Sequence, residues 1–121
     1  DQFVKGITQI AQEGAIQIFQ EFNTGMEEII TGVVGMLQFD VLKFRLKSEY
    51  NVDIILETLP YEHIRWIVNK DIDPMKITGT TDMKRIRDLK GNPLLLFINP
   101  WSVGMVLDRN KGLELAEFSR N

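Results

Sequence analysis

The chain has 121 residues, which is enough for one domain with a hydrophobic core and too few for two domains of ordinary size. Its net charge of −3 argues against unspecific attraction to nucleic acid or to an anionic membrane, although it allows a local basic face. The absence of cysteine excludes disulfides, thiolate nucleophiles and cysteine-based zinc sites. No run of about 18 apolar residues occurs, so no membrane-spanning helix is predicted.

Five elements are predicted in the first half of the chain, in the order helix, strand, strand, helix and strand, at residues 2–13, 15–20, 28–34, 37–50 and 52–59. The first helix has one apolar and one polar side, and Gly14 follows it as a C-cap. Asn23, Thr24 and Gly25 are typical turn residues, so the strands that flank them are predicted to form a hairpin. Gly35 ends the second strand before the second helix begins.

The second helix carries two apolar stripes on nearly opposite sides. One stripe consists of Leu37, Val41 and Phe44, and the other consists of Phe39, Leu42, Leu46 and Tyr50. A helix that lies on a sheet in water needs only one such stripe. The second stripe therefore predicts that this helix is buried on two sides, between a sheet and another part of the protein.

One more strand is expected at residues 63–69, before a loop, and the second half of the chain is predicted to contain three strands and a third helix. The strands of the second half are expected at residues 84–89, 94–98 and 113–118. The segment 71–82 has the composition of a loop and is the predicted boundary between two halves of one domain. Asn99 followed by Pro100 is a helix-start signal, which predicts a helix over residues 101–110.

Together these elements predict an α+β fold. The first half fits a ferredoxin-like split β-α-β core whose first strand would precede Asp1, because an amphipathic pattern already runs at the first residue. The second half adds a ββαβ extension. We therefore predict a single domain over residues 1–121, with a ferredoxin-like half at 1–70, a loop at 71–82 and a ββαβ half at 83–121.

The stretch from Gly32 to Val52 is the most specific in the chain. It resembles the segment of bacterial peptide chain release factor 3 in which a strand turns through glycine into the central helix of the third, C-terminal domain. Translocases and tetracycline ribosomal-protection proteins have a related third domain, in which this turn usually reads Gly-Met-Gly-Glu-Leu-His. Here it reads Gly35-Met36-Leu37-Gln38-Phe39. The resemblance also covers residues 11–19; it is detailed up to Trp66 and then extends only to the order of the elements.

This resemblance implies a domain of a translational GTPase that acts in translation termination in the bacterial cytoplasm. Such a protein binds the ribosome and promotes the departure of class-I release factors after peptide release. GTP or GDP, with Mg²⁺, would be bound by its N-terminal domain, so no cofactor is expected in this chain. The third domain would contact the small ribosomal subunit, through rRNA or a ribosomal protein, and would couple to the G domain and the second domain. Membranes and DNA are not expected partners.

The residues themselves do not predict an enzyme. The glycines never take the G-x-x-x-x-G-K-[ST] spacing of a P-loop, so GTP binding through that motif is not expected. His63 is the only histidine and is interpreted as a polar strand residue. Ser48, Ser102 and Ser119 form no recognisable set with it. No catalytic, cofactor-binding or metal site is therefore predicted.

Two basic groups and one Arg–Trp pair are the candidate contact residues. Ribosome or interdomain contacts are predicted at Lys43, Arg45 and Lys47 on the second helix, at Arg65 and Trp66, and at Lys84, Arg85 and Arg87 on a strand where Arg85 and Arg87 share a face. Lys and Arg can contact rRNA phosphates or an acidic protein surface, and Trp with Arg is typical of interface hot spots. Two alternatives stay open: the basic residues form a solvated face with ion pairs such as Asp40 with Lys43, and Trp66 belongs to the core.

Other functions are compatible with parts of the sequence. The third domain of a translocase or of a ribosomal-protection protein would have a related fold. A freestanding ferredoxin-like sensor would bind a small effector between helix and sheet, but the chain has no glycine-rich effector loop. A hydrolase finds no support in the residues beyond scattered acids.

Overall fold

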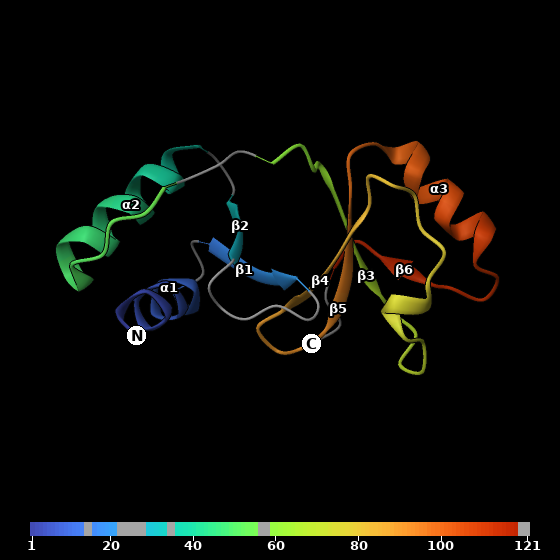
Figure 1. The fold of residues 1–121 in the computed structure, drawn as a ribbon, viewed down its shortest axis with the longest axis horizontal. Helices are drawn as coiled ribbons and strands as arrows, with labels where there is room; N and C mark the ends of the chain where they lie inside the picture. The colour runs from blue at the N-terminus through green and yellow to red at the C-terminus, as the bar shows by residue number, and fades with distance from the viewer. Residues whose placement is uncertain (14–15, 22–28, 34–35, 56–58, 119–121) are drawn as a thin grey trace. The chain divides into compact units, whose positions relative to one another are not determined.

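The computed structural model describes residues 1–13, 16–21, 29–33, 36–55 and 59–118. These residues form two compact units: unit 1 comprises those within 1–20 and 24–58, and unit 2 comprises those within 21–23 and 59–121. The chain mixes helices with antiparallel strands (Figure 1), so the predicted α+β fold of ferredoxin-like type is confirmed. The predicted domain limits, with one domain over the whole chain and a loop at 71–82, stay a prediction.

Unit 1 contains a β-hairpin and two helices. Its elements are α1 (Gln2–Gln12), β1 (Ile16–Glu21), β2 (Ile29–Val33) and α2 (Met36–Tyr50). β1 pairs antiparallel with β2, and Ile16 lies opposite Val33, which confirms the predicted pairing of these strands. The predicted cap at Gly14, the turn at 23–25 and the break at Gly35 lie outside the described residues.

The hydrophobic core of unit 1 joins both helices to β1. Its buried members are Ile7, Ile10, Ile16, Ile18, Leu42 and Leu46. The two helices approach closely at Gly6 of α1, where an added Cβ would lie 2.8 Å from the ring of Tyr50 and 2.9 Å from Leu46. Tyr50 also donates its hydroxyl hydrogen to Oε1 of Gln9 at 2.5 Å. A glycine in the middle of α1 therefore permits the contact between the helices.

Only one of the two apolar stripes of α2 is buried. Leu42 and Leu46 lie in the core, whereas the side chains of Val41 and Phe44 are 46% and 70% exposed. The side chain of Leu37 lies outside the described part of the chain. The predicted burial of α2 on two sides is therefore wrong for the described residues, because α1 and β1 cover one side only.

The predicted strand at 52–59 is wrong over its described part, since residues 52–55 form no strand. Asn51 ends α2 in the left-handed conformation, with a φ of 56°, and donates its N–H to the carbonyl four residues earlier at 3.1 Å. Val52 and Ile54 then pack against the core of unit 1, while the residues that follow each of them are exposed. This alternation produces the period-two pattern of a strand without a neighbouring strand.

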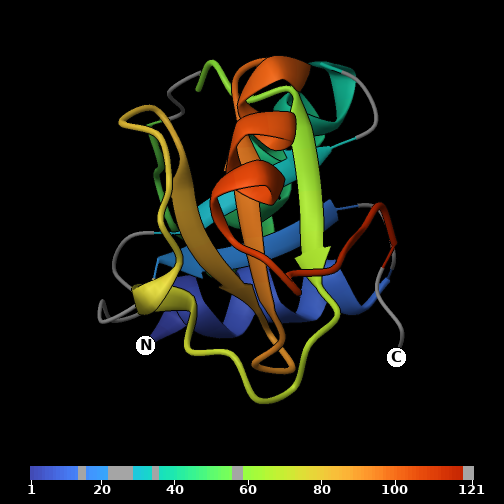
Figure 2. The same cartoon turned by 90° about the vertical axis from the view of Figure 1, so that its right-hand side faces the viewer.

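Unit 2 contains, among its described residues, an antiparallel sheet and one α-helix. Its elements are β3 (His63–Ile67), the 3-10 turn η1 (Pro74–Lys76), β4 (Lys84–Asp88), β5 (Pro93–Phe97), α3 (Pro100–Arg109) and β6 (Leu115–Ala116). The strand order within the unit is β4-β5-β3-β6, and each neighbouring pair is antiparallel. Figure 2 shows α3 lying across one face of this sheet.

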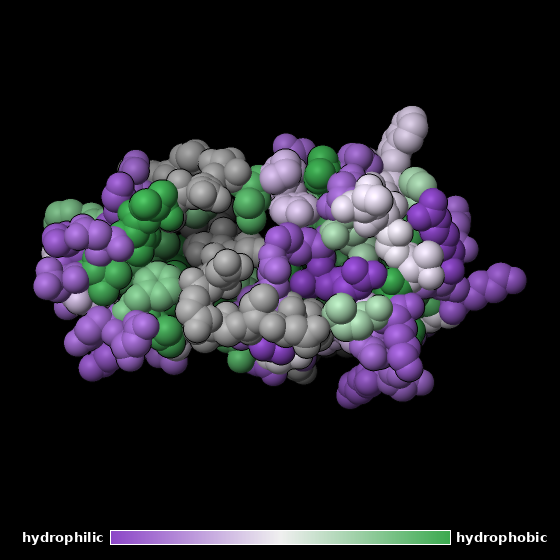
Figure 3. Space-filling view, viewed as in Figure 1, coloured by the Kyte–Doolittle hydropathy of each residue, from purple (hydrophilic) through white to green (hydrophobic). Residues whose placement is uncertain are grey.

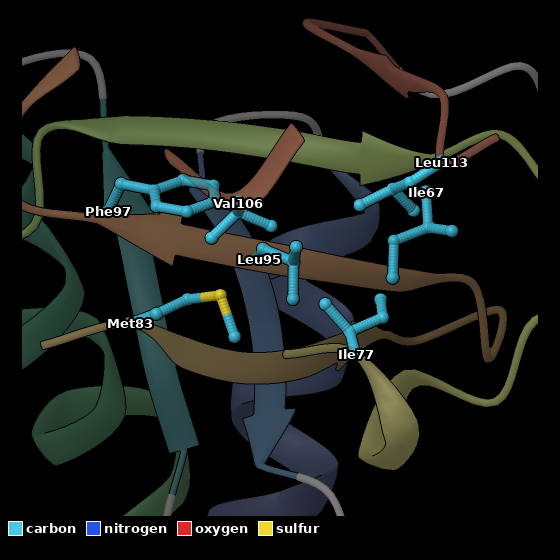
Figure 4. Packing of buried hydrophobic residues seen from close by; sticks show 7 residues of the cluster. All are labelled: Ile67, Ile77, Met83, Leu95, Phe97, Val106 and Leu113. Carbon is cyan, nitrogen blue, oxygen red and sulfur yellow. The ribbon is translucent and has the colours of Figure 1, made fainter. Parts of the chain in front are cut away.

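The core of unit 2 is built around β5. Residues 94–97 are all buried, so both faces of this strand are covered. One core cluster joins the sheet to α3 and to the segments around η1, and it consists of Ile67, Ile77, Met83, Leu95, Phe97, Val106 and Leu113 (Figure 4). The buried cluster fixes the position of α3 on the sheet.

The element types predicted from residue 63 onward are confirmed; β3, β4 and β6 are shorter than predicted, and β5 is shifted by one residue. α3 begins as expected: Pro100 stands in its first turn, and Oδ1 of Asn99 accepts the N–H of Ser102 at 3.0 Å. The last strand, predicted at 113–118, is confined to two residues. The segment 71–82 contains η1 and otherwise no regular element.

Candidate functional site

Arg45, a candidate contact residue on α2, forms hydrogen bonds with the carboxylates of Glu13 and Glu49. Its Nη1 and Nη2 donate to Oε1 and Oε2 of Glu13 at 2.6 and 2.9 Å. Its Nε and Nη2 also donate to the carboxylate of Glu49 at 2.7 and 3.1 Å. These four hydrogen bonds use four of the five N–H donors of the guanidinium, so Arg45 has one donor left to offer a phosphate. It connects the end of α1 to α2 and holds the helix in place.

These contacts also shift the pKa values of the three side chains. Hydrogen bonds from Arg45 lower the pKa of Glu13 and that of Glu49 from the ordinary value of 4.5. Hydrogen bonds to Glu13 and Glu49 in turn raise the pKa of Arg45. All three groups are therefore charged at neutral pH, and one guanidinium with two carboxylates leaves a net charge of −1. This group does not attract an anion.

The exposed side of α2 carries the other two candidate contact residues of this helix, Lys43 and Lys47. We call it the outer face of α2, and it consists of Asp40, Val41, Lys43, Phe44, Lys47 and Ser48. Lys47 pairs with Asp53 at 3.1 Å, and Lys43 forms no ion pair within the described chain, so the alternative pair with Asp40 is absent. Figure 3 shows hydrophobic residues reaching the surface over α1 and α2. On this face Phe44 can make apolar contacts, and the neighbouring Lys43 and Lys47 can attract negative charge.

Arg85 of β4 has a structural position in unit 2. Its Nε donates to the carbonyl of Pro74 at 2.8 Å, and its Nη2 donates to the carbonyl of Ile77 at 2.6 Å. The side chain is half-buried, and it fastens both ends of η1 to the sheet. Satisfying two carbonyls in a short irregular segment is a role that a charged donor fulfils well.

Arg65 and Trp66 of β3 are also engaged within unit 2. Nη1 of Arg65 donates to the carbonyl of Ile64 at 2.9 Å, and its Nη2 lies 3.4 Å from Oε1 of Glu117. Nε1 of the half-buried Trp66 donates to Oδ2 of Asp88 at 3.4 Å. The structure thus places Trp66 partly inside the protein, in line with the alternative that it contributes to the core.

The strand register shows which basic residues share a face of the sheet. Arg65 and Arg85 both lie opposite Leu95, so they flank β5 on the side that α3 covers. Arg85 and Arg87 alternate with Ile86, which confirms that they share this face. Lys84 points to the other face and pairs with Glu21. The second basic group is therefore divided between two faces.

Comparison with known proteins relates these residues to a family. Residues 1–107 match the family described as class II release factor RF3, C-terminal domain. The chain belongs to this family. The match includes the outer face of α2 and every other candidate contact residue of the RF3 C-terminal domain described here.

Curated relatives carry the name peptide chain release factor 3. The protein from Symbiobacterium thermophilum is 40% identical over 111 residues, which cover 92% of this chain and 21% of the relative. The protein from Gloeobacter violaceus is 39% identical over 119 residues, which cover 98% of this chain and 22% of the relative. The RF3 C-terminal domain described here thus spans about one fifth of the length of these relatives.

Among the described residues of this RF3 C-terminal domain, three exposed aromatic residues were not sequence candidates, namely Phe44, Trp101 and Phe118. Phe44 lies on the outer face of α2, and Trp101 lies in the first turn of α3 with 82% of its side chain exposed. The sequence signal for Phe44 was the presence of two apolar stripes on its helix, because Phe44 belongs to the stripe that the core does not bury. The signal for Trp101 is the spacing of residues along α3. Ser102 and Val106 are buried, and helical geometry puts Trp101 on the opposite side of the helix.

The remaining residues that the sequence singled out have the following positions in the described part of this RF3 C-terminal domain. Among the described residues, no group of three or more His, Asp or Glu side chains is arranged to hold a metal ion. None of the described helices has the length and apolar character needed to span a bilayer. His63 is half-buried at the start of β3, and Ser102 donates its hydroxyl hydrogen to Asn99 within the cap of α3.

Proposed function

We propose that this chain is the ribosome-contacting and interdomain-coupling domain of a peptide chain release factor 3. Its parent would be a GTPase of the bacterial cytoplasm that promotes the release of class-I release factors from the ribosome. GTP or GDP and Mg²⁺ would bind in another domain, which the length of the relatives accommodates. The observation that carries the proposal is the family match over residues 1–107. This match favours a release factor over a translocase or a small-ligand sensor.

Within this proposal, the outer face of α2 is the contact surface. The clamp of Arg45 with Glu13 fixes the helix, and the burial of Leu42 and Leu46 directs its opposite side outward. An aromatic residue that is held on a rigid element and surrounded by polar side chains is typical of an interface hot spot. Phe44 therefore has the position expected of an anchor.

The partner we propose for this face is the small ribosomal subunit, through either rRNA or a ribosomal protein. Lys43 and Lys47 would contact phosphates or acidic side chains, and Phe44 would fill an apolar site or stack on a base. The remaining basic candidates, which the fold itself engages, would support the domain. Contacts with the G domain and the second domain of the parent would transmit the nucleotide state to this surface.

Co-sedimentation with 70S ribosomes tests the surface. We expect weak binding of the 121-residue chain that decreases at high salt, because exposed charge pairs are screened. The double variant Lys43→Gln/Lys47→Gln should bind less at low salt, and Phe44→Ser should bind less at both salt concentrations. Lys70→Gln/Lys111→Gln is the matched control, since it removes the same charge from exposed positions of unit 2. Equal loss in both double variants would contradict the assignment to α2.

A further inference from the structure

Residues 72–79, which contain η1, pack against the core cluster of unit 2, and we call them the η1 strap. Ile77, the buried residue of the strap, is 4% exposed and belongs to the same cluster as Leu95 of β5 (Figure 4). Ile72 is partly buried against this cluster, whereas Met75 is exposed. The strap therefore enters the core of the described chain through two isoleucines.

Side chains, rather than a neighbouring strand, tie the main chain of the η1 strap to the rest of unit 2. Within the described chain, the hydrogen bonds between main-chain groups of residues 72–79 stay inside the strap. The hydrogen bonds that leave the strap connect it to Arg85 of β4 and to Arg109 and Asn110 at the end of α3. A segment that is held in this way has no strand ladder to break when it moves, and few buried contacts are typical of a region with low local stability.

Asn110 links the η1 strap to the end of α3 through a single amide. Its Oδ1 accepts the N–H of Thr78 at 2.9 Å, and its Nδ2 donates to the carbonyl of the same residue at 2.8 Å. The same Nδ2 also donates to the carbonyl of Val106, in the last turn of α3, at 2.7 Å. The amide thus pairs with both main-chain groups of Thr78, as a neighbouring strand would, and satisfies a carbonyl at the end of the helix.

The ties from β4 and from α3 meet around the buried side chain of the strap. Nη2 of Arg85 donates to the carbonyl of Ile77 at 2.6 Å, and Asn110 holds the next residue, Thr78. Arg109 contributes less, because its hydrogen bond to the strap is 3.3 Å long and exposed. Displacing Ile77 from the core therefore breaks the bonds of Arg85 and Asn110 together, which makes the opening of the strap cooperative.

We infer that the η1 strap is a conformational device that opens as one unit, with Arg85 and Asn110 as its latches, while the sheet of unit 2 stays paired. Opening takes Ile77 out of the core and frees the amide of Asn110, so the strap and the end of α3 change together. A protein partner that displaced either of them would alter the other, since coupling between two sites is reciprocal. The inference does not rest on the proposed ribosome contact of α2, because every residue that carries it lies in unit 2.

Thiol labelling of the 121-residue chain tests the opening, because the chain has no cysteine of its own. Ile77→Cys places a thiol at the buried position of the strap, and Ile86→Cys is the matched control, since it makes the same substitution at a buried position of β4. With an aromatic disulfide reagent, Ile77→Cys should react at least about tenfold faster than its global unfolding allows, and urea should change this rate little because little surface is exposed. Ile86→Cys should react only as fast as its global unfolding allows, with the full urea dependence.

Substitution of the latches separates the device from ordinary fraying. In the Ile77→Cys chain, Asn110→Ala and Arg85→Met should each raise the labelling rate by about fivefold or more, because each removes two hydrogen bonds to the strap. Arg109→Met is the matched control, and it should change the rate by less than about twofold because it removes one long, exposed bond. None of the three should speed the labelling of Ile86→Cys relative to its global unfolding.

Labelling of both thiols through global unfolding, with the same urea dependence, would overturn the inference. Equal acceleration of both thiols by the latch substitutions would overturn it as well. Should Ile77→Cys not fold, amide hydrogen exchange of the unmodified chain gives the same decision. The N–H of Thr78 should then exchange faster, and with a weaker urea dependence, than the N–H groups that join β3 to β5, and equal urea dependence would contradict a separate opening of the strap.

Discussion

Arg45 in the middle of α2 and Glu13 directly after α1 form a two-pronged hydrogen-bonded pair, with Nη1–Oε1 and Nη2–Oε2 distances of 2.6 and 2.9 Å. The pair joins residues 32 positions apart, and it adds to the apolar contacts between the two helices and to the hydrogen bond from Tyr50 to Gln9. It also pairs, at the surface, a cation that the sequence alone presents as unpaired. Arg45 therefore has a structural role within unit 1, and its role as a contact residue stays a prediction.

Acid should weaken unit 1 through this pair. The pKa values of Glu13 and Glu49 are lower in the folded chain than their ordinary value of 4.5, so the unfolded chain takes up protons first. The stability that they contribute is complete above the unfolded pKa and is lost as pH falls through the lowered values. Urea midpoints should therefore decrease between about pH 5 and pH 3 more steeply in the native chain than in Arg45→Met. Parallel pH profiles would contradict this prediction.

Two glycine-to-alanine substitutions should have opposite effects on stability. Gly104→Ala adds a methyl group to open space in a helix, which should raise the free energy of unfolding by about 0.5–1 kcal/mol. Gly6→Ala places a Cβ 2.8 Å from the ring of Tyr50, which should cost about 1–3 kcal/mol despite the better helix propensity. Chemical denaturation of both variants measures the two signs. Stabilisation by Gly6→Ala would show that α1 and α2 are not in contact there.

Removing the guanidinium of Arg85 should release η1 from the sheet. Arg85→Met leaves the carbonyl of Ile77 without the arginine donor and leaves the carbonyl of Pro74 only the N–H of Ile77, at 3.4 Å, which should cost about 1–3 kcal/mol. Compared with the native chain, the variant should exchange its amide hydrogens faster at residues 72–79, whereas exchange in the strands should change little. Arg109→Met is the control, because its exposed bond to Gly79 should matter much less. Unchanged exchange in Arg85→Met would show that η1 holds its position without the arginine.

The end of α2 should tolerate glycine and resist β-branched residues. Asn51 has a φ of 56°, a conformation that asparagine and glycine adopt more readily than other residues. Asn51→Gly should be close to neutral, whereas Asn51→Val should cost about 1–2 kcal/mol through backbone strain. Thermal unfolding of the two variants gives the comparison. Equal melting temperatures would mean that the turn after α2 adapts to the substitution.

The parts of the fold that depend on local signals could be predicted from the sequence. Asn99 and Pro100 mark the start of α3 because a cap and a fixed φ act within one helical turn. Val52 and Ile54 misled the prediction of a strand, because alternating burial on a core and alternating burial in a sheet give the same pattern. The difference lies in whether another strand lies alongside, which is a property of the tertiary structure.

The internal partners of the candidate contact residues could not be predicted, because they lie far away in the sequence or on the backbone. Arg45 and Arg85 have the residue type and spacing of contact residues, but the acceptors of Arg45 include Glu13 and those of Arg85 are backbone carbonyls. Neither kind of partner can be inferred from one sequence. The sequence did contain a signal for an exposed anchor at Phe44, because α2 has two apolar stripes. The structure shows that the core buries the stripe of Leu42 and Leu46 and leaves the stripe of Phe44 exposed.

The turn that Arg85 fastens offers a fixed point for attaching a chemical probe. Met75 lies in η1, is exposed, and sits between the two carbonyls that the arginine holds. Because the chain has no cysteine, Met75→Cys would introduce a single thiol to which an iron chelate could be coupled. Hydroxyl radicals released there would cut nearby RNA strands, and the pattern of cuts would map the surroundings of unit 2 in a bound complex.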